Sequence, residues 1–186
     1  MKICDKIISR IVSASEEKEY ITVAIDGRCA SGKTTLAKQI SDKIPCNVFH
    51  TDDFFLRPVQ RTPERYAEPG GNFDRERFEK EILLQIKKGL PFSYLPFDCR
   101  TMTLSSPVSV TPKKISIIEG AYSAHPLLLN YYDLTVFLSV SEAEQRKRIE
   151  KRNPDFSDKF FNRWIPLEEK YISEYDMENK CDLSFE

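Results

Sequence analysis

The segment Gly27-Arg28-Cys29-Ala30-Ser31-Gly32-Lys33-Thr34 constrains this chain most, because it has the spacing G-x-x-x-x-G-K-[ST]. A run rich in β-branched residues, Tyr20–Ile25, precedes it, and a helix-forming stretch, Lys33–Ile44, follows it. In a strand, loop and helix of this kind, successive backbone N–H groups can wrap a polyphosphate, and side chains at the two glycine positions would obstruct that approach. The N-terminus of the helix adds a favourable partial charge. The motif therefore predicts binding of a nucleoside triphosphate.

The last two residues of the loop motif are predicted to contact the phosphates and the metal ion. Lys33 is expected to reach the β- and γ-phosphates, and the Thr34 hydroxyl is expected to ligate Mg²⁺. ATP and Mg²⁺ are the expected cofactors, with the preference for ATP over GTP left open. The residues predicted to bind the nucleotide are Gly27, Ala30, Ser31, Gly32, Lys33, Thr34 and Thr35.

Length and composition limit which kinds of nucleotide-binding protein this chain can be. The 186 residues predict one domain spanning 1–186, since domains average roughly 150 residues. With 28 basic and 29 acidic residues the net charge is −1, which argues against a protein held to nucleic acid or anionic lipid by bulk charge. No run approaches the roughly 20 apolar residues of a membrane span. Five scattered cysteines without close pairs favour reduced thiols and a cytoplasmic protein.

Alternating strand-like and helix-like runs predict the fold class. The expectation is an α/β protein with three layers, a mostly parallel sheet with helices on both faces. Strands are predicted at Tyr20–Ile25, Asn47–Thr51, Lys114–Ile118, Leu134–Val140 and Asp182–Phe185, and helices at Lys33–Ile44, Arg75–Lys88, Ser141–Arg152 and Leu167–Asn179. The N-terminal apolar pattern from Ile3 to Val12 is interrupted by charges and predicts an amphipathic helix docked on the domain rather than a secretory leader. Proline- and glycine-rich stretches at 55–72 and 89–112 predict surface excursions suited to holding an acceptor.

A second motif tests whether the chain is a GTPase switch. Asn179-Lys180-Cys181-Asp182 matches the guanine-reading pattern N-K-x-D, but it follows a charged helix and has only four residues after it. No D-x-x-G follows the phosphate-binding loop. Both observations disfavour a nucleotide-binding switch, which remains the least favoured alternative.

Several motifs in series carry a family resemblance over nearly the whole chain. They are the loop with Thr34-Thr35, then Thr51-Asp52-Asp53-Phe54-Phe55, Asn72-Phe73-Asp74, Pro96-Phe97-Asp98, Ile117-Ile118-Glu119-Gly120, and an arginine-rich stretch from Arg146 to Arg152. This order resembles the uridine kinase and phosphoribulokinase-like family of P-loop kinases. The resemblance implies an arginine-bearing lid near 146–165 and transfer of the γ-phosphoryl group of ATP to a small-molecule hydroxyl. A nucleoside such as uridine or cytidine is the leading acceptor, and a pantothenate-like or sugar alcohol is the alternative.

The expected catalytic residues are Lys33, Asp52 and Arg152. A carboxylate at the C-terminal end of a strand beside the loop can take the proton of the acceptor hydroxyl, and Asp52 matches the position where the family has its base. Asp53 is the alternative, since either residue could instead cap the following turn. Glu119 ends an apolar strand and is expected to hold Mg²⁺ through water, or to be a strand-end residue facing solvent.

Arginines on a mobile lid can neutralise the charge that builds during phosphoryl transfer. Arg148 and Arg152 share one helix face, whereas Arg146 lies on another and Lys147 and Lys151 form a second pair. Arg152 is favoured because Asn153-Pro154 breaks the helix there, although a merely solvated helix is the competing interpretation. Arg163 is a further lid candidate, and Trp164 is expected to pack the base of the lid.

The acceptor site is less well defined by the sequence. Its expected members are Asp52, Asp74, Phe97, Arg100, Arg148 and Arg152. Asp74 resembles the family carboxylate that binds sugar hydroxyls, but it could equally cap the helix that follows. Phe97 stands where the family has an aromatic beside the base, yet Cys99 and Arg100 follow where uridine kinases have another aromatic and then a histidine. His50 and His125 are expected to be structural, and the sequence leaves a homo-oligomer open.

Overall fold

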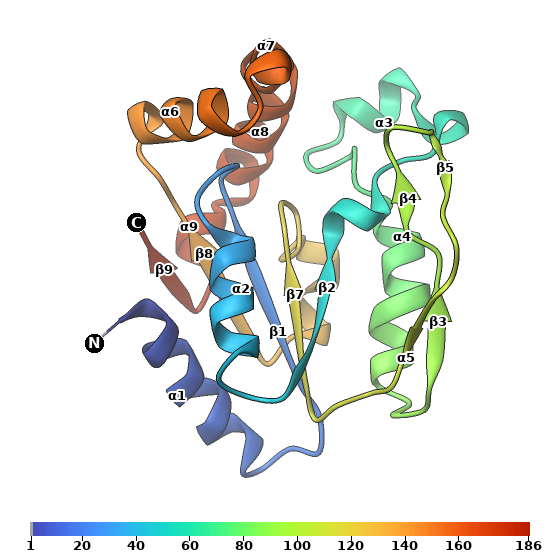
Figure 1. Cartoon of the computed structure of the whole chain (residues 1–186), viewed down its shortest axis with the longest axis vertical. Helices are drawn as coiled ribbons and strands as arrows, with labels where there is room; N and C mark the ends of the chain where they lie inside the picture. The colour runs from blue at the N-terminus through green and yellow to red at the C-terminus, as the bar shows by residue number, and fades with distance from the viewer. Residues whose placement is uncertain (1) are drawn as a thin grey trace.

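The computed structural model describes residues 2–186 and contains a central sheet of five parallel strands (Figure 1). The strands are β1 (Ile21–Gly27), β2 (Cys46–His50), β7 (Ile115–Glu119), β8 (Leu134–Leu138) and β9 (Leu183–Phe185), in the spatial order β2-β7-β1-β8-β9. All ladders are parallel, and β1, β7 and β8 are buried along their whole length. Such burial on both faces explains why these three strands are near-continuous apolar runs.

Helices cover both faces of the sheet, which gives the three predicted layers. One apolar cluster joins α1 (Ile3–Ser15) and α2 (Lys33–Ser41) to one face of β1, β7 and β8. A second cluster joins the opposite face to a layer that includes α4 (Arg75–Phe78), η3 (Glu79–Leu83), α5 (Leu84–Ile86), α8 (Ile165–Tyr175) and α9 (Met177–Lys180). The predicted N-terminal helix is confirmed, with Cys4, Ile7 and Ile11 buried on its inner face.

Two predicted helices differ in detail from the structure. The helix expected at Arg75–Lys88 contains a π-helical turn, η3, and ends at Ile86. The helix expected at Leu167–Asn179 begins earlier and breaks at Asp176, which takes a left-handed conformation (φ 51°) between α8 and α9. Asp tolerates that conformation better than most residues, because its short side chain can bond locally, here accepting from Asn179.

The segments between the main elements form short structures. The first excursion contains the short helices η2 (Pro58–Gln60) and α3 (Pro63–Ala67), and it follows η1 (Thr51–Phe54). The second contains two small antiparallel pairs, β3 (Phe92–Tyr94) with β6 (Val108–Val110) and β4 (Phe97–Asp98) with β5 (Thr103–Leu104). Another short helix, η4 (Pro126–Tyr131), precedes β8. No helix within 2–186 is both long and apolar enough to cross a bilayer.

Residues 146–165, where the lid is expected, belong to a chain of helical pieces that stand above the C-terminal edge of the sheet in Figure 1. They are α6 (Glu142–Arg152), η5 (Pro154–Phe156), α7 (Ser157–Lys159) and the π-helical η6 (Phe160–Trp164), which runs into α8. The excursion bearing α3 stands on the other side of the same edge (Figure 1). Because β1, β2 and β7 all end at this edge, their terminal residues meet between the two raised segments.

Candidate active site

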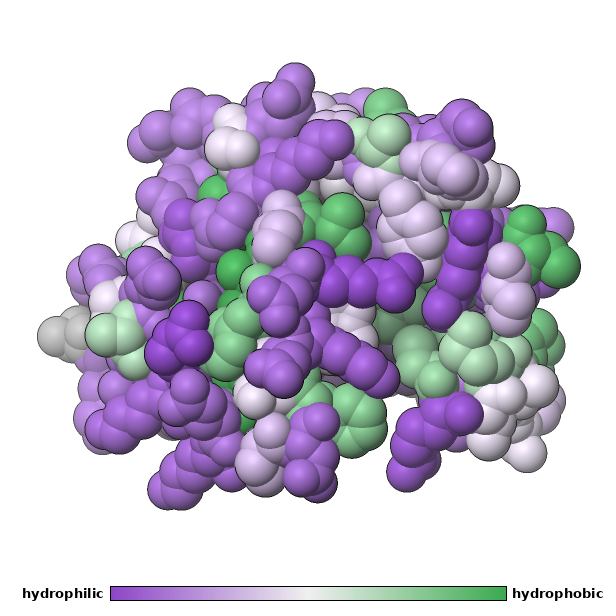
Figure 2. All heavy atoms as spheres, turned by 90° about the horizontal axis from the view of Figure 1, so that it is seen from above, coloured by the Kyte–Doolittle hydropathy of each residue, from purple (hydrophilic) through white to green (hydrophobic). Residues whose placement is uncertain are grey.

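A cavity of about 1080 Å³ opens at this edge. Viewed from above, this end of the molecule is hollowed, with strongly hydrophilic side chains around the hollow (Figure 2). The phosphate-binding loop, the start of η1, the loop after β7 and the lid all contribute to its walls. Of the residues predicted from the sequence, those that line it are Ala30, Ser31, Gly32, Lys33, Thr34, Thr35, Asp52, Glu119, Arg148, Arg152, Arg163 and Trp164.

The conformation of the loop depends on residues with positive φ. Ala30 has φ 59° and Gly32 has φ 102°, and Gly32 is the N-cap of α2. A Cβ atom on Gly32 would meet nothing within 4 Å, which leaves the space above it free for a ligand. At Gly27 the reason for glycine differs from the expected one, because a Cβ there would lie 2.0 Å from the Leu138 carbonyl oxygen. Gly27 therefore permits the close pairing of β1 with β8 rather than the approach of a phosphate.

Two polar groups of the loop fit an anion. The buried Lys33 ammonium donates to the carbonyl oxygens of Gly27 at 2.7 Å and Arg28 at 2.8 Å. The Ser31 hydroxyl oxygen is buried and has no hydrogen-bond partner. Because an unpaired buried hydroxyl is costly, its position beside the cavity favours a ligand that completes its bonding.

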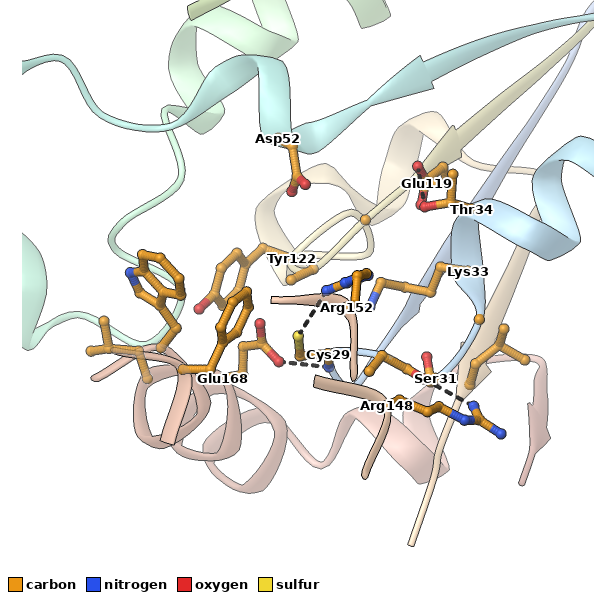
Figure 3. Close-up of a pocket in the computed structure, with 18 of the residues that line it drawn as sticks. Cys29, Ser31, Lys33, Thr34, Asp52, Glu119, Tyr122, Arg148, Arg152 and Glu168 are labelled. Atoms are coloured by element: carbon orange, nitrogen blue, oxygen red, sulfur yellow. Dashed lines mark hydrogen bonds between the residues drawn. The ribbon is translucent and has the colours of Figure 1, made fainter. Parts of the chain in front are cut away.

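Thr34 and Glu119 meet at the mouth of the loop (Figure 3). The Thr34 hydroxyl donates to the Glu119 carboxylate at 3.0 Å, and His50 Nδ1 lies 2.5 Å from the same oxygen. Hydrogen bonding to Glu119 raises the pKa of His50, against the opposing effect of burial. The contact arises because β2 and β7 pair in register, with His50 opposite Glu119. His50, which the sequence suggested to be structural, thus contacts a carboxylate that lines the cavity, although His50 itself does not line it.

The oxygen pair of Thr34 and Glu119 suits Mg²⁺. Within 2–186 no three His, Cys, Asp or Glu residues form a group that could hold a metal by themselves. Mg²⁺ bound with nucleotides uses one or two protein oxygen ligands together with phosphate oxygens and water. The hydroxyl and carboxylate oxygens of Thr34 and Glu119 are hard donors of the required kind, 3.0 Å apart.

Asp52 and Asp53 follow β2 but face different surroundings. The Asp52 carboxylate projects into the cavity toward the loop (Figure 3). Although open to solvent there, it is enclosed by protein on its other sides, and this desolvation raises its pKa while Lys33 opposes the rise. Asp53 instead accepts from the Tyr94 hydroxyl at 3.2 Å, and its carbonyl accepts from Arg77 at 2.8 Å. Asp53 is therefore engaged in packing, whereas Asp52 is free to meet a ligand.

The lid arginines lie along the wall facing the loop. Arg148 donates to the Ala30 carbonyl at 2.9 Å and pairs with Glu144, and Arg152 approaches the Cys29 sulfur at 4.0 Å. Arg163 stacks over the Tyr66 ring. Arg146 packs on Phe161 and lies outside the cavity, as do Lys147 and Lys151. Trp164 packs edge-to-face on Phe160, as expected for the lid base, but it also lines the cavity.

The predicted acceptor residues divide into three environments, the first of which is the main cavity lined by Asp52, Arg148 and Arg152. Asp74 is 1% exposed and caps α4 by accepting from the Arg77 amide, so it does not line the cavity. Phe97 and Arg100 line a smaller adjoining cavity of about 390 Å³ that Asp52 and Cys99 share. Phe97 is buried there, while the Arg100 side chain is 92% exposed. The helix cap expected for Asp74 is observed through Oδ1, while its Oδ2 is buried without a hydrogen-bond partner, and its role toward an acceptor stays a prediction.

Further polar residues that line the cavity include Arg61, Tyr122 and Glu168, which lie outside the motifs, and Asn72, which opens the motif Asn72-Phe73-Asp74 but was not predicted as a site residue. Arg61 donates through Nε to the Leu56 carbonyl, and the Asn72 side-chain oxygen is buried without a partner. Glu168 is half-buried at the start of α8 and accepts from the Cys29 amide at 2.8 Å (Figure 3). For Arg61, Tyr122 and Glu168 the only sequence signal is position, since they fall in the irregular excursion, after a strand end and just beyond the predicted lid, respectively.

In the motif Asn179-Lys180-Cys181-Asp182, which matches the guanine-reading pattern, Asn179 and Asp182 make structural hydrogen bonds away from the cavity. Asn179 donates to Asp176, and Asp182 accepts from the amide and hydroxyl of Thr135. None of the four residues of that motif lines the cavity.

Comparison with known proteins agrees with these features. No protein-family model matches the chain. Uridine kinases from two strains of Ureaplasma parvum serovar 3 are 28% identical to it over 138 residues, covering 68% of this chain and 66% of theirs, slightly under two thirds of their length. A solved structure described as a possible uridine kinase from Bacillus stearothermophilus has a TM-score of 0.71 at 22% identity, covering 97% of this chain and all of that one. Shikimate kinase from Bacteroides thetaiotaomicron has a TM-score of 0.50 at 16% identity, covering 89% and 85%.

The chain therefore has the three-layer α/β fold of the P-loop kinases. Within that class it resembles the uridine kinases in both sequence and fold, as its ordered motifs predict.

Proposed function

We propose that this protein is a cytoplasmic kinase that uses ATP and Mg²⁺ to phosphorylate a hydroxyl group of a small molecule. The observation that carries the proposal is the position of Asp52, a carboxylate in the same cavity as Lys33 and the unpaired Ser31 hydroxyl. A switch protein needs no such carboxylate beside the γ-phosphate, whereas a kinase needs one to receive the proton of its acceptor.

In the proposed reaction the acceptor oxygen forms a bond to the γ-phosphorus as the bond from that phosphorus to the β,γ-bridging oxygen breaks. Asp52 takes the hydroxyl proton, and its raised pKa suits that role because a base works best with a pKa nearer the operating pH. Lys33 exchanges its two loop carbonyls for phosphate oxygens. Arg152 is positioned on the lid wall to stabilise the transferring group. Thr34 and Glu119 would hold Mg²⁺, which neutralises phosphate charge when it is bound.

A nucleoside such as uridine or cytidine is the leading acceptor, on the strength of the similarity to uridine kinases. A second candidate is a sugar or another non-nucleoside alcohol. The position of Asp74 favours this second candidate, because the carboxylate expected to bind the ribose hydroxyls does not line the cavity.

A panel of nucleosides, vitamins and sugars, scored by acceptor-dependent ADP release and by the phosphorylated product, tests the proposal. Asp52→Asn should depress transfer on the order of 10² to 10⁴ while leaving ATP affinity nearly unchanged. Asp53→Asn is the matched control and should retain most of the activity. Loss of transfer with Asp53→Asn alone would move the base by one residue, and ATP binding with no product from any acceptor would contradict the kinase.

A further inference from the structure

The outer half of the phosphate-binding loop is held by side chains from the lid and from α8. Gln145 donates to the Cys29 carbonyl at 3.0 Å, and Arg148 donates to the Ala30 carbonyl at 2.9 Å. From α8, Glu168 binds the Cys29 amide and Glu169 binds the Arg28 guanidinium at 2.8 Å. A negatively charged ligand bound in the loop therefore lies close to the side chains that connect the loop to the lid and to α8.

Of these four side chains that contact the loop, Glu168 is the one carboxylate that also lines the cavity, alongside the carboxylates of Asp52 and Glu119 already described. Its neighbour Glu169 neutralises Arg28 outside the cavity, so the two consecutive glutamates differ in what they face. Burial raises the pKa of Glu168 to about 7, while Lys33 and the Cys29 amide oppose the rise and Asp26 and Asp52 add to it. The other charged or titratable groups around Glu168 are Arg152 from the lid, Tyr122 from the loop after β7, and the Cys29 thiol, whose pKa burial raises to about 11.

The electrostatic surroundings of Glu168 change when a triphosphate binds. The ligand brings several negative charges to the loop that Glu168 touches. It also engages Lys33, which is the cation that most favours the ionised form of Glu168. Both changes make the ionised form of Glu168 less favourable, because its negative charge then lies near the triphosphate in a space of low dielectric constant. A carboxylate in that position binds a proton and becomes neutral.

We propose that Glu168 is a positioning residue that couples the phosphate-binding loop to α8, the helix that continues from the lid: as a carboxylate it holds the Cys29 amide of the free protein, and it takes up a proton when the triphosphate enters. The proton comes from solvent, and no covalent bond other than the O–H bond forms. Protonation weakens the hold on Cys29, because a neutral carboxyl group is a poorer acceptor than a carboxylate. Nucleotide binding then loosens one of the contacts through which α8 fixes the loop.

The inference rests on the nucleotide-binding part of the proposed function and needs no acceptor. Titration calorimetry with Mg²⁺ and a non-hydrolysable ATP analogue at pH 7.5, in buffers of different ionisation enthalpy, measures the protons taken up on binding. Wild type should take up about half a proton, since a group with a pKa near 7 is mostly ionised at that pH and becomes mostly neutral. Affinity should correspondingly fall as the pH rises from about 7 to 8.5, because binding consumes a proton.

Glu168→Gln should abolish this uptake, because an amide cannot titrate but keeps an oxygen to accept from Cys29. Glu169→Gln is the matched control on the same helix and should retain the uptake. The pH dependence of affinity in the wild type tests the inference even if Glu168→Gln does not fold. An uptake that persists in a folded Glu168→Gln protein, or a wild-type affinity that does not change with pH, would overturn it. Failure of the analogue to bind would instead contradict the proposed function.

Discussion

Lys33 is the buried cation of the loop, and its ammonium group is held by two backbone carbonyls. Lys33→Ala should lower the rate of phosphoryl transfer on the order of 10² to 10³, because an electrostatic donor to the transferring group is lost. The measurement is kcat with the best acceptor from the panel. Lys38→Ala is the control, because Lys38 lies on the exposed face of the same helix, paired with Asp42. Near-normal turnover of Lys33→Ala would remove Lys33 from the proposed mechanism.

At the level of single residues, the sequence identified side chains that are fixed by local geometry. Thr34 lies at the start of α2 and Asp52 lies just after the end of β2. Each side chain lines the cavity because these two ends of the elements lie at the same edge of the sheet. His50 and Glu168 could not be found in this way. Each is brought to the site by a contact with a distant part of the chain, His50 with Glu119 and Glu168 with Cys29.

At the level of elements, the two loop glycines should behave differently. Gly27→Ala should lower the free energy of unfolding by about 2 to 4 kcal/mol, because the new Cβ collides with the β8 backbone in addition to the strain of positive φ. Gly32→Ala should cost only about 1 to 2 kcal/mol, since its Cβ meets nothing and only the conformational strain remains. Urea unfolding monitored by circular dichroism measures both, and equal losses would contradict the assignment of Gly27 to strand pairing.

The elements themselves were largely predictable, because β1, β7 and β8 are apolar runs of strand length and α2 and α6 begin directly after loop signals. The break at Asp176 was not, because nothing in the charged pattern of that stretch requires a helix to end there. The tertiary structure sets that end, since Met177 on the far side is fully buried in the core.

At the level of the whole molecule, His125 should make stability sensitive to acid. It is 2% exposed, stacks on Tyr171 and accepts from the Leu127 amide, and burial lowers its pKa to about 4. The unfolded chain binds a proton at His125 below about pH 6.5, but the folded protein does not until about pH 4. Stability that is fully present above pH 6.5 is therefore lost as the pH falls toward 4, by about 3 kcal/mol from this residue.

His125→Asn tests this expectation, because the Asn oxygen can still accept from Leu127 but does not titrate in this range. Urea unfolding of both proteins at pH 7 and pH 4.5 should show a smaller loss in acid for the variant. Equal losses for the two proteins would assign the acid sensitivity to other groups.

The sequence by itself determined the phosphate-binding loop, the parallel three-layer fold and the candidate base, because each depends on neighbouring residues and on the periodicity of apolar side chains. Only the tertiary structure decided that Asp74 caps a helix, that Gly27 serves the pairing of β1 with β8, that Glu168 lines the cavity, and that His50 contacts Glu119. These outcomes depend on which strand ends and lid residues meet at one edge of the sheet. Such meetings join residues far apart along the chain, and local patterns do not encode them.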